Sequence, residues 1–400
     1  MWEKTSSLES DHKNDLMLFA SGILIFIGGL TGKPLLFMIS GVFILYYLLN
    51  YIYDKNISDK LLLKNEQEVI RLFPGDQSIL SFTFENKSRY PYLNGKLRFD
   101  TGNAISIDTD ANQPGQKEHQ HILPLTMISK GNTVLEVPIS AKKRGSVKIV
   151  NIDYRFPHLF KFHLIQLSYL PYFQKEIIVY PRPLVIPGLD DYFHTAPGEQ
   201  RFSMSPFEDI ENRIGTRDYQ YGDPFHRINW KASVKAQQLQ THTYEKVIDA
   251  SLVFIINLEP QESWNTMASS SQTEKNLSYA AYLSQFATER KYPFELYLNI
   301  RKSGSTPYVH LPEGAGMSHY MRSLELLARV NEYPITFPAE QMMYRIGQAF
   351  SRPKTMIIIG PISDRTKRIL NEWSTFHRVI HLSEAADQAF LRPIGRGSAS

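Results

Sequence analysis

The chain has 400 residues, and 42% of them are hydrophobic, which is enough for two or three domains with substantial cores. Its 44 lysine and arginine residues nearly balance 40 aspartate and glutamate residues, and the net charge of +4 does not favour nucleic-acid binding. The chain has no cysteine, which excludes disulfide bonds, thiolate catalysis and cysteine-ligated zinc.

Two apolar stretches near the N-terminus, Leu16–Gly32 and Pro34–Tyr53, predict a pair of membrane helices. At 1.5 Å per residue they would be about 25 and 30 Å long, close to the thickness of the hydrocarbon core. Neither has a polar face, so a buried hairpin of a soluble domain is the weaker alternative. The first stretch has no small-residue cleavage site after it, so we do not expect a cleaved signal peptide. We expect the short polar segment Met1–Asp15 to be disordered or to lie at the membrane interface.

The lysines around these stretches predict the orientation of the pair. Five lie beyond its outer ends and one lies in the connection, and such an excess marks the cytoplasmic side. We therefore predict that residues 1–55 form a transmembrane hairpin in the lipid bilayer. The protein would be a multi-pass cell-membrane protein with two spans and cytoplasmic soluble domains. The outer lysines are Lys4, Lys13, Lys55, Lys60 and Lys64, and the connection holds Lys33.

Residues 56–183 predict a β-sandwich-like domain. Short runs such as Ile79–Phe84 and Val147–Tyr154 alternate between apolar and polar residues, as half-buried strands do. Turn signals such as Pro74-Gly75-Asp76 separate the runs. Several short strands at this spacing are typical of a sandwich.

Residues 184–400 predict a linker-like stretch, a segment rich in special residue types, and then an α/β domain. Apolar runs at 250–258, 294–300, 356–360 and 378–382 predict buried strands, with a short edge candidate at 308–311. Segments 274–290, 320–330 and 364–373 predict helices between them. Apolar strands that alternate with helices indicate a parallel sheet covered on both faces.

The special residue types are concentrated in residues 209–245. Tyr219-x-x-Gly222-Asp223-Pro224 predicts a tight turn, because glycine tolerates positive φ and aspartate before proline starts turns. A short helical piece, Ala232–Leu239, follows the turn. The segment has no metal, nucleophile or phosphate-loop pattern, so we interpret it as a polar brace or a docking surface. Its candidate interaction residues are Arg217, Tyr219, Gly222, Asp223, Arg227, Asn229, Trp230 and Lys231.

The same segment carries a family resemblance. Arg217-x-Tyr219-x-x-Gly222-Asp223, then Arg227–Ser233, then Tyr244-Glu245 resembles the signature of domain-of-unknown-function family 58. Weaker matches at 143–145 and 179–183 precede it in the family's order, so the resemblance covers the chain roughly from residue 16 onward. It implies a C-terminal half similar to von Willebrand factor A domains, which have a Rossmann-like fold. It also implies partnership with a MoxR-type AAA+ ATPase and with a membrane protein that has a transglutaminase-like domain.

The resemblance also points to a position that differs from the usual metal site. Von Willebrand factor A domains often bind a divalent metal through Asp-x-Ser-x-Ser at the end of the first strand. Here the corresponding residues are Asn257-Leu258-Glu259-Pro260-Gln261. Asn257 and Glu259 could supply oxygen ligands, but the aspartate and both serines are missing. We expect no functional metal and no cofactor.

Three roles remain open for the signature segment. Arg217, Asp223, Arg227 and Trp230 could lock it onto the α/β domain, because arginine pairs with carboxylates and tryptophan is a large apolar anchor. The same residues could form a docking surface for a partner. A hydrolase-type site would use the aspartates with His226 and an arginine, but their spacing matches no known triad or carboxylate pair.

The function that we expect is that of a membrane-anchored, non-catalytic interaction protein. It would work with the MoxR-type ATPase in complex assembly or cell-envelope maintenance. The alternatives are a hydrolase that uses the Asp/His/Arg cluster, or an adhesion-type binder that depends on a divalent metal.

Overall fold

In the computed structural model the chain divides into two compact units, Met1–Tyr180 and Pro181–Ser400. The structure describes residues 2–5, 9–57, 60–107, 119–161, 163–194, 208–221, 223–246, 251–260, 270–385 and 388–395. Each unit has a hydrophobic core of its own. The finer domain boundaries at residues 55/56 and 183/184 stay predictions.

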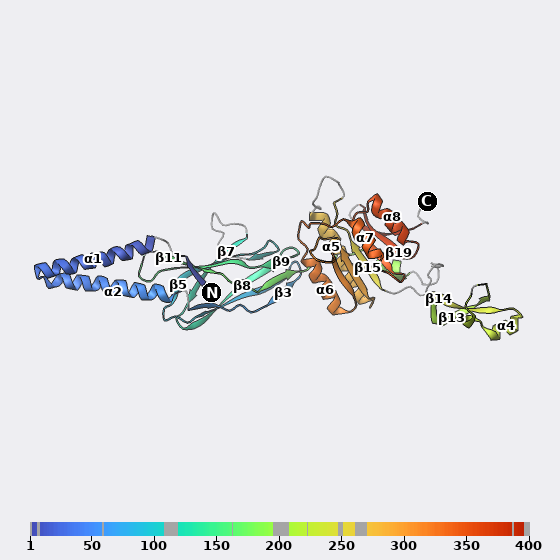
Figure 1. Ribbon diagram of the computed structural model, residues 1–400, viewed down its shortest axis with the longest axis horizontal. Coiled ribbons are helices and arrows are strands. Elements are labelled where there is room, and N and C mark those ends of the chain that lie inside the picture. The colour runs from blue at the N-terminus through green and yellow to red at the C-terminus, as the bar shows by residue number, and fades with distance from the viewer. Residues whose placement is uncertain are drawn as a thin grey trace. The chain divides into compact units, whose positions relative to one another are not determined.

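The first unit begins with an antiparallel pair of helices, α1 (Glu9–Thr31) and α2 (Pro34–Asn56) (Figure 1). Proline at the first position of α2 suits a helix start, because no intrahelical bond needs its missing N–H. Ser40 Oγ donates a hydrogen bond to Ser21 O across the pair. Many apolar side chains of both helices are exposed, among them Leu30 and Met38. The pair therefore is not the buried hairpin of a soluble core.

Among the described residues, one helix is long and apolar enough to cross a membrane, Pro34–Lys55. The apolar part of α1, Met17–Thr31, is shorter than that requirement. The structure thus shows one candidate membrane span. An N-terminal signal sequence can have the same length and the same apolar composition. The two-span arrangement stays a prediction.

Our expectation of a disordered start was wrong for Trp2–Thr5, whereas a position at the membrane interface stays a prediction. This segment forms strand β1, which pairs antiparallel with β11 (Leu164–Tyr169). Trp2 is only 3% exposed, and its ring lies against Phe84 and Tyr169. The large apolar surface of one tryptophan outweighs the polar character of the residues that follow it.

The rest of the first unit is β-sandwich-like, as predicted. A five-stranded sheet has the order β1-β11-β10-β5-β7, a four-stranded sheet has the order β2-β4-β8-β6, and a small sheet has the order β3-β12-β9. Alternate residues of each long strand enter the core, for example Leu80, Phe82 and Phe84 of β4. The strands not yet located are β2 (Leu61–Leu63), β3 (Val69–Leu72), β4 (Gln77–Asn86), β5 (Tyr92–Asp100), β6 (Ile105–Ile107), β7 (Gln120–Met127), β8 (Gly131–Ala141), β9 (Gly145–Lys148), β10 (Val150–Pro157) and β12 (Glu176–Val179).

The second unit contains a six-stranded sheet of order β17-β16-β15-β18-β19-β20. The four central strands are parallel, but both edge strands run antiparallel to their neighbours. The sheet is therefore mixed rather than all parallel, because the chain turns back on itself at each edge. The strands are β15 (Leu252–Ile256), β16 (Phe294–Leu298), β17 (Val309–Gly314), β18 (Thr355–Ile359), β19 (Arg378–Ala385) and β20 (Gln388–Ile394).

Helices cover both faces of this sheet, as the sequence predicted. Residues of α7 (Ala339–Gly347) and α8 (Asp364–Trp373) share one core cluster with alternate residues of the central strands. On the other face, α5 (Ser270–Glu289) contacts β15, β18 and α6 (Met317–Ala328). A short helix, α3 (Leu189–His194), precedes this domain. The sequence patterns did not predict α7 or β20.

Candidate functional site

The signature residues lie in a two-stranded hairpin with a helical insert, residues 208–246, which we call the signature hairpin. Strand β13 (Glu208–Asp218) pairs antiparallel with β14 (Gln240–Lys246), with register shifts near Arg213 (Figure 1). Between the strands lie a short 3-10 turn, η1 (Phe225–Arg227), and helix α4 (Trp230–Ala236). The sequence predicted the turn and the helix but neither strand. Gly222 lies outside the described residues.

Arg217 and Asp223 hold the turn of the hairpin together. The Arg217 guanidinium donates two hydrogen bonds of 2.8 Å to the two Asp223 carboxylate oxygens. Gln220 N also donates to Asp223 Oδ2 at 2.9 Å, and the Tyr219 hydroxyl donates to Asp223 O at 3.2 Å. The hydrogen bonds from Arg217 and Gln220 hold the pKa of Asp223 below its usual value. Three signature residues thus meet around one turn and fix its shape.

Asn229 fixes the start of α4. Its side-chain oxygen accepts a hydrogen bond of 3.1 Å from Ala232 N, which is the usual role of asparagine at an N-cap. Ser233 Oγ donates to Asn229 O and accepts from Gln240 N, so the helix is tied to β14. Gln237 ends the helix in the left-handed region, at φ 54°. Asn229 therefore supports the shape of the hairpin through its side-chain oxygen.

Around this polar frame the hairpin exposes a set of large apolar side chains, which we call the apolar tip. Trp230 is 65% exposed and Val234 is 80% exposed, and residues four apart lie on the same face of a helix. Lys231, between them in sequence, is exposed as well, whereas Arg227 is half-buried. Soluble surfaces rarely gather exposed aromatic side chains without a binding role. The members of the apolar tip are Tyr221, Phe225, Trp230, Val234 and Leu239.

The contacts and the exposure of the signature residues bear on the choice between a brace and a docking surface. A brace would need contacts with the α/β domain. Arg217 and Asp223 pair with each other within the hairpin. Trp230 would be buried as an anchor, but it is mostly exposed. Sequence reasoning missed Tyr221, Phe225, Val234 and Leu239. The spacing of Trp230 and Val234 was a signal, but sequence alone does not tell whether a helical face is covered.

Two carboxylates in the described part of the hairpin accept hydrogen bonds from neighbouring side chains. Asp218 Oδ1 accepts a hydrogen bond from Gln240 Nε2, and Asp223 is bound by Arg217. His226 is exposed on the 3-10 turn.

At the position of the usual metal site, Asn257 is part of a network of amide hydrogen bonds. Its side-chain oxygen accepts from Asn299 Nδ2 at 2.8 Å and from Glu259 N at 3.0 Å. Its side-chain nitrogen donates to Pro361 O at 2.7 Å. Glu259 Oε2 accepts from Ala339 N at 3.4 Å. Among the residues that the structure describes, no group of three or more His, Cys, Asp or Glu side chains could hold a metal ion.

No known protein-family profile matches the chain, and no curated protein matches it either. Among solved structures, it matches a Salmonella alpha-2-macroglobulin mutant at 15% identity and a TM-score of 0.21, over 31% of this chain and 7% of that one. It matches a PapD-like domain of human CEP192 at 13% identity and a TM-score of 0.18, over 30% of this chain and 84% of that one. It also matches a cohesin–dockerin complex from Clostridium thermocellum at 12% identity and a TM-score of 0.21, over 30% of this chain and 92% of that one. The chain thus spans about 7% of the length of the macroglobulin, and likenesses this weak carry no argument about its function.

Proposed function

We propose that the protein is a membrane-anchored, non-catalytic interaction protein whose signature hairpin docks on a partner protein. The observation that carries the proposal is the apolar tip, where aromatic residues such as Phe225 and Trp230 are exposed on a hairpin held in shape by polar contacts. Exposed aromatic residues on a rigid frame are typical of the residues that dominate binding energy at protein interfaces.

The partner that we propose is a MoxR-type AAA+ ATPase, as the resemblance to domain-of-unknown-function family 58 implies. A membrane protein with a transglutaminase-like domain would be a further member of the complex. The signature residues would act in two groups: Arg217, Tyr219, Asp223 and Asn229 shape the hairpin, while Trp230, Lys231 and Arg227 lie on or beside the docking surface. In this proposal the C-terminal mixed sheet is a von Willebrand factor A-like domain without a resident metal.

The helical pair would be a retained membrane anchor with two spans and with both soluble units in the cytoplasm. Contacts at the end of α2 support an anchor that is not cleaved. Asp54 Oδ1 accepts from Lys4 Nζ at 2.7 Å and from His158 Nε2 at 3.2 Å, and Asp54 Oδ2 accepts from Lys161 Nζ at 3.1 Å. Tyr53 is fully buried against aromatic residues of the sandwich. Cleavage between the helices and the sandwich would remove side chains that the sandwich core contains.

The proposal is tested by binding between the full chain in detergent and the purified ATPase. Trp230→Ala and Phe225→Ala should each weaken binding at least tenfold. Tyr344→Ala is the matched control, because Tyr344 is an aromatic residue on α7 with a similarly exposed side chain. Equal binding by all three variants and the unchanged protein would contradict docking through the apolar tip.

A further inference from the structure

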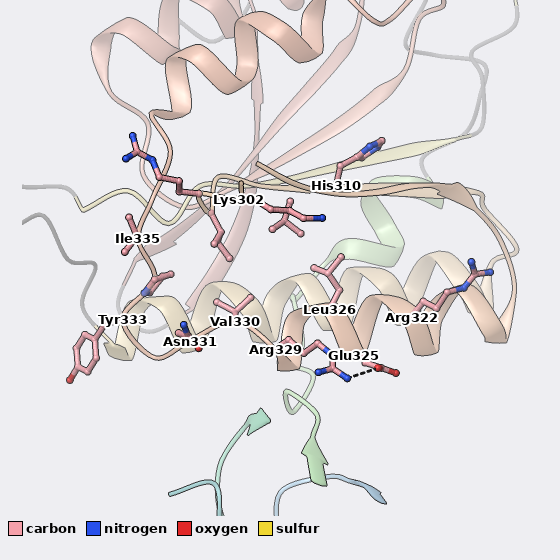
Figure 2. Close-up of a pocket in the computed structure, with 14 residues that line it drawn as sticks. Lys302, His310, Arg322, Glu325, Leu326, Arg329, Val330, Asn331, Tyr333 and Ile335 are labelled. Atoms are coloured by element: carbon pink, nitrogen blue, oxygen red, sulfur yellow. Dashed lines mark hydrogen bonds and ion pairs between the residues drawn. The ribbon is translucent and has the colours of Figure 1, made fainter. Parts of the chain in front are cut away.

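The second unit has a pocket at the β17 edge of its sheet that is separate from the signature residues. Its volume is about 700 Å³, within the range of about 300–1,000 Å³ that is usual for small-molecule sites. It lies between α6, the loop that follows β16, and the start of β17. Residues 331–335, which follow α6, close one end (Figure 2).

The floor of the pocket is apolar. Leu326 of α6 and Val330, which follows the helix, point toward the loop that carries Lys302, as Figure 2 shows. Ile300 and Val309 also line this space, and Ile335 adds an exposed apolar side chain at its end. An apolar floor of this kind would accept a flat hydrocarbon body, because burying such surfaces removes them from water.

The charged lining of the pocket is predominantly cationic. Arg301, Lys302, Arg322 and Arg329 contribute four positive charges, and Glu325 is the carboxylate in the lining. Glu325 Oε1 accepts a hydrogen bond of 3.0 Å from Arg329, so the carboxylate is already neutralised on the outer side of α6 (Figure 2). Four positive charges against one leave an excess of three around an apolar floor.

The carboxylate beneath the pocket does not cancel this excess. Glu295 is buried and accepts hydrogen bonds from Lys354 at 2.8 Å and from Tyr297 at 2.8 Å. His310 lines the pocket, stacks on Tyr297 with ring centroids 4.2 Å apart, and points Nε2 at Glu295 at 3.5 Å. Lys354 also donates a hydrogen bond of 2.7 Å to Glu313, so this lysine and the two carboxylates carry one net negative charge, which is smaller than the excess of three positive charges.

We propose that this pocket binds a small anion that carries an apolar body, of the aryl phosphate or aryl carboxylate class. Guanidinium groups bind phosphate and carboxylate oxygens in a bidentate way, which selects the head group. The apolar floor selects the body, and together they favour such a ligand over neutral aromatic compounds and over bare inorganic anions. Arg322 and Lys302 bind the head group, while Leu326 and Val330 contact the body. The site does not depend on the proposed docking role of the signature hairpin.

The test is calorimetric titration of the full chain, in nanodiscs of zwitterionic lipid, with 1-naphthyl phosphate. Empty nanodiscs correct for partition of the probe into lipid. The expected result is saturable binding with one site per chain. 1-Naphthol and inorganic phosphate should each bind at least tenfold more weakly, because each lacks one half of the recognised chemistry.

Charge-reversed variants locate the binding. Lys302→Glu and Arg322→Glu should each weaken binding at least tenfold, and Arg322→Gln should lie between Arg322→Glu and the unchanged protein. Arg368→Glu is the matched control, since Arg368 is an exposed arginine on α8 that does not line the pocket. Equal melting temperatures of the variants show that they remain folded. The proposal is overturned if the unchanged protein shows no saturable binding, if Arg322→Glu binds as tightly as Arg368→Glu, or if inorganic phosphate alone binds as tightly as the naphthyl ester.

Discussion

Asn299 Nδ2 donates a hydrogen bond of 2.8 Å to Asn257 Oδ1, and both side chains are buried. Asn257 in turn donates to Pro361 O, so its amide works as acceptor and donor at once. A carboxylate at this position could accept both bonds but could not donate one. The two hydrogen bonds that Asn257 accepts and the one that it donates therefore require an amide side chain at this position.

From this we expect Asn257→Asp to lower the free energy of unfolding, by about 1–3 kcal/mol for the unpaired carbonyl of Pro361. We also expect the variant to bind Mg²⁺ no better than the unchanged protein, because one carboxylate does not make a set of hard ligands. Denaturant unfolding and calorimetry with Mg²⁺ on the full chain measure the two effects. Micromolar Mg²⁺ binding by the unchanged protein that disappears in Asn257→Ala would show that the altered loop still holds a metal.

Trp230→Ala is expected to leave the melting temperature of the protein nearly unchanged. The sequence alone suggests the opposite, because losing a buried tryptophan costs about 3–5 kcal/mol. The exposed position of Trp230 removes that cost, whereas binding to the ATPase should fall at least tenfold. Ile228→Ala is the contrasting variant, since Ile228 is a buried residue of the same hairpin. A melting temperature that falls as much for Trp230→Ala as for Ile228→Ala would contradict the exposed tip.

The Arg217–Asp223 contact makes the order of the signature hairpin depend on pH. The pKa of Asp223 is lower in the folded hairpin than in the unfolded chain. Its contribution to stability is therefore present above the unfolded value, about 3.9, and is lost as pH falls through the lower folded value. We expect hydrogen exchange in residues 208–221 and 223–246, corrected for intrinsic rates, to become faster over that acidic range.

Asp223→Asn should remove this acid dependence and lower the protection already at neutral pH. Arg227→Ala should have a smaller effect on protection, since Arg217 makes both short bonds to the carboxylate. Equal acid sensitivity in Asp223→Asn and the unchanged protein would show that another group controls the hairpin.

The parts of the fold that sequence predicted are those in which local pattern and burial agree. Strand β18 is buried throughout and apolar from Met356 to Ile359, and α8 begins at Asp364 after a capping box between Ser363 and Thr366. Strand β1 escaped prediction because its partner, β11, lies some 160 residues away and no local pattern records that pairing. Strands β13 and β14 are polar, so backbone pairing and one turn hold them rather than an alternating apolar face. The turn and the helix of the signature hairpin could be predicted from sequence. The exposure of its aromatic residues could not, because it depends on which other parts of the fold pack against them.

The orientation of the helical pair is expected to place the connection between α1 and α2 outside the cytoplasm. The natural chain has no cysteine, so single cysteines can be introduced without background. In intact cells an impermeant maleimide should label Thr31→Cys at the connection and leave Ser303→Cys in the second unit protected. Both positions are exposed on the protein itself, so only the membrane should separate them. The reverse labelling pattern would overturn the cytoplasmic assignment.

Trp2 is expected to matter for folding although it is the second residue of the chain. Its side chain is 3% exposed, and its ring centroid lies 5.2 Å from that of Tyr169 and 6.4 Å from that of Phe84. Removing a buried tryptophan side chain leaves a cavity and typically costs about 3–5 kcal/mol. Trp2→Ala should therefore lower the melting temperature of the sandwich in detergent by several degrees or more.

Trp230→Ala serves as the control in the same chain, because it removes the same side chain from an exposed position. The comparison also bears on the anchor. Strand β1 precedes the first helix, so a processing event that removes this helix would also remove β1 and its pairing with β11. An unchanged melting temperature for Trp2→Ala would mean that the sandwich is stable without the N-terminal strand.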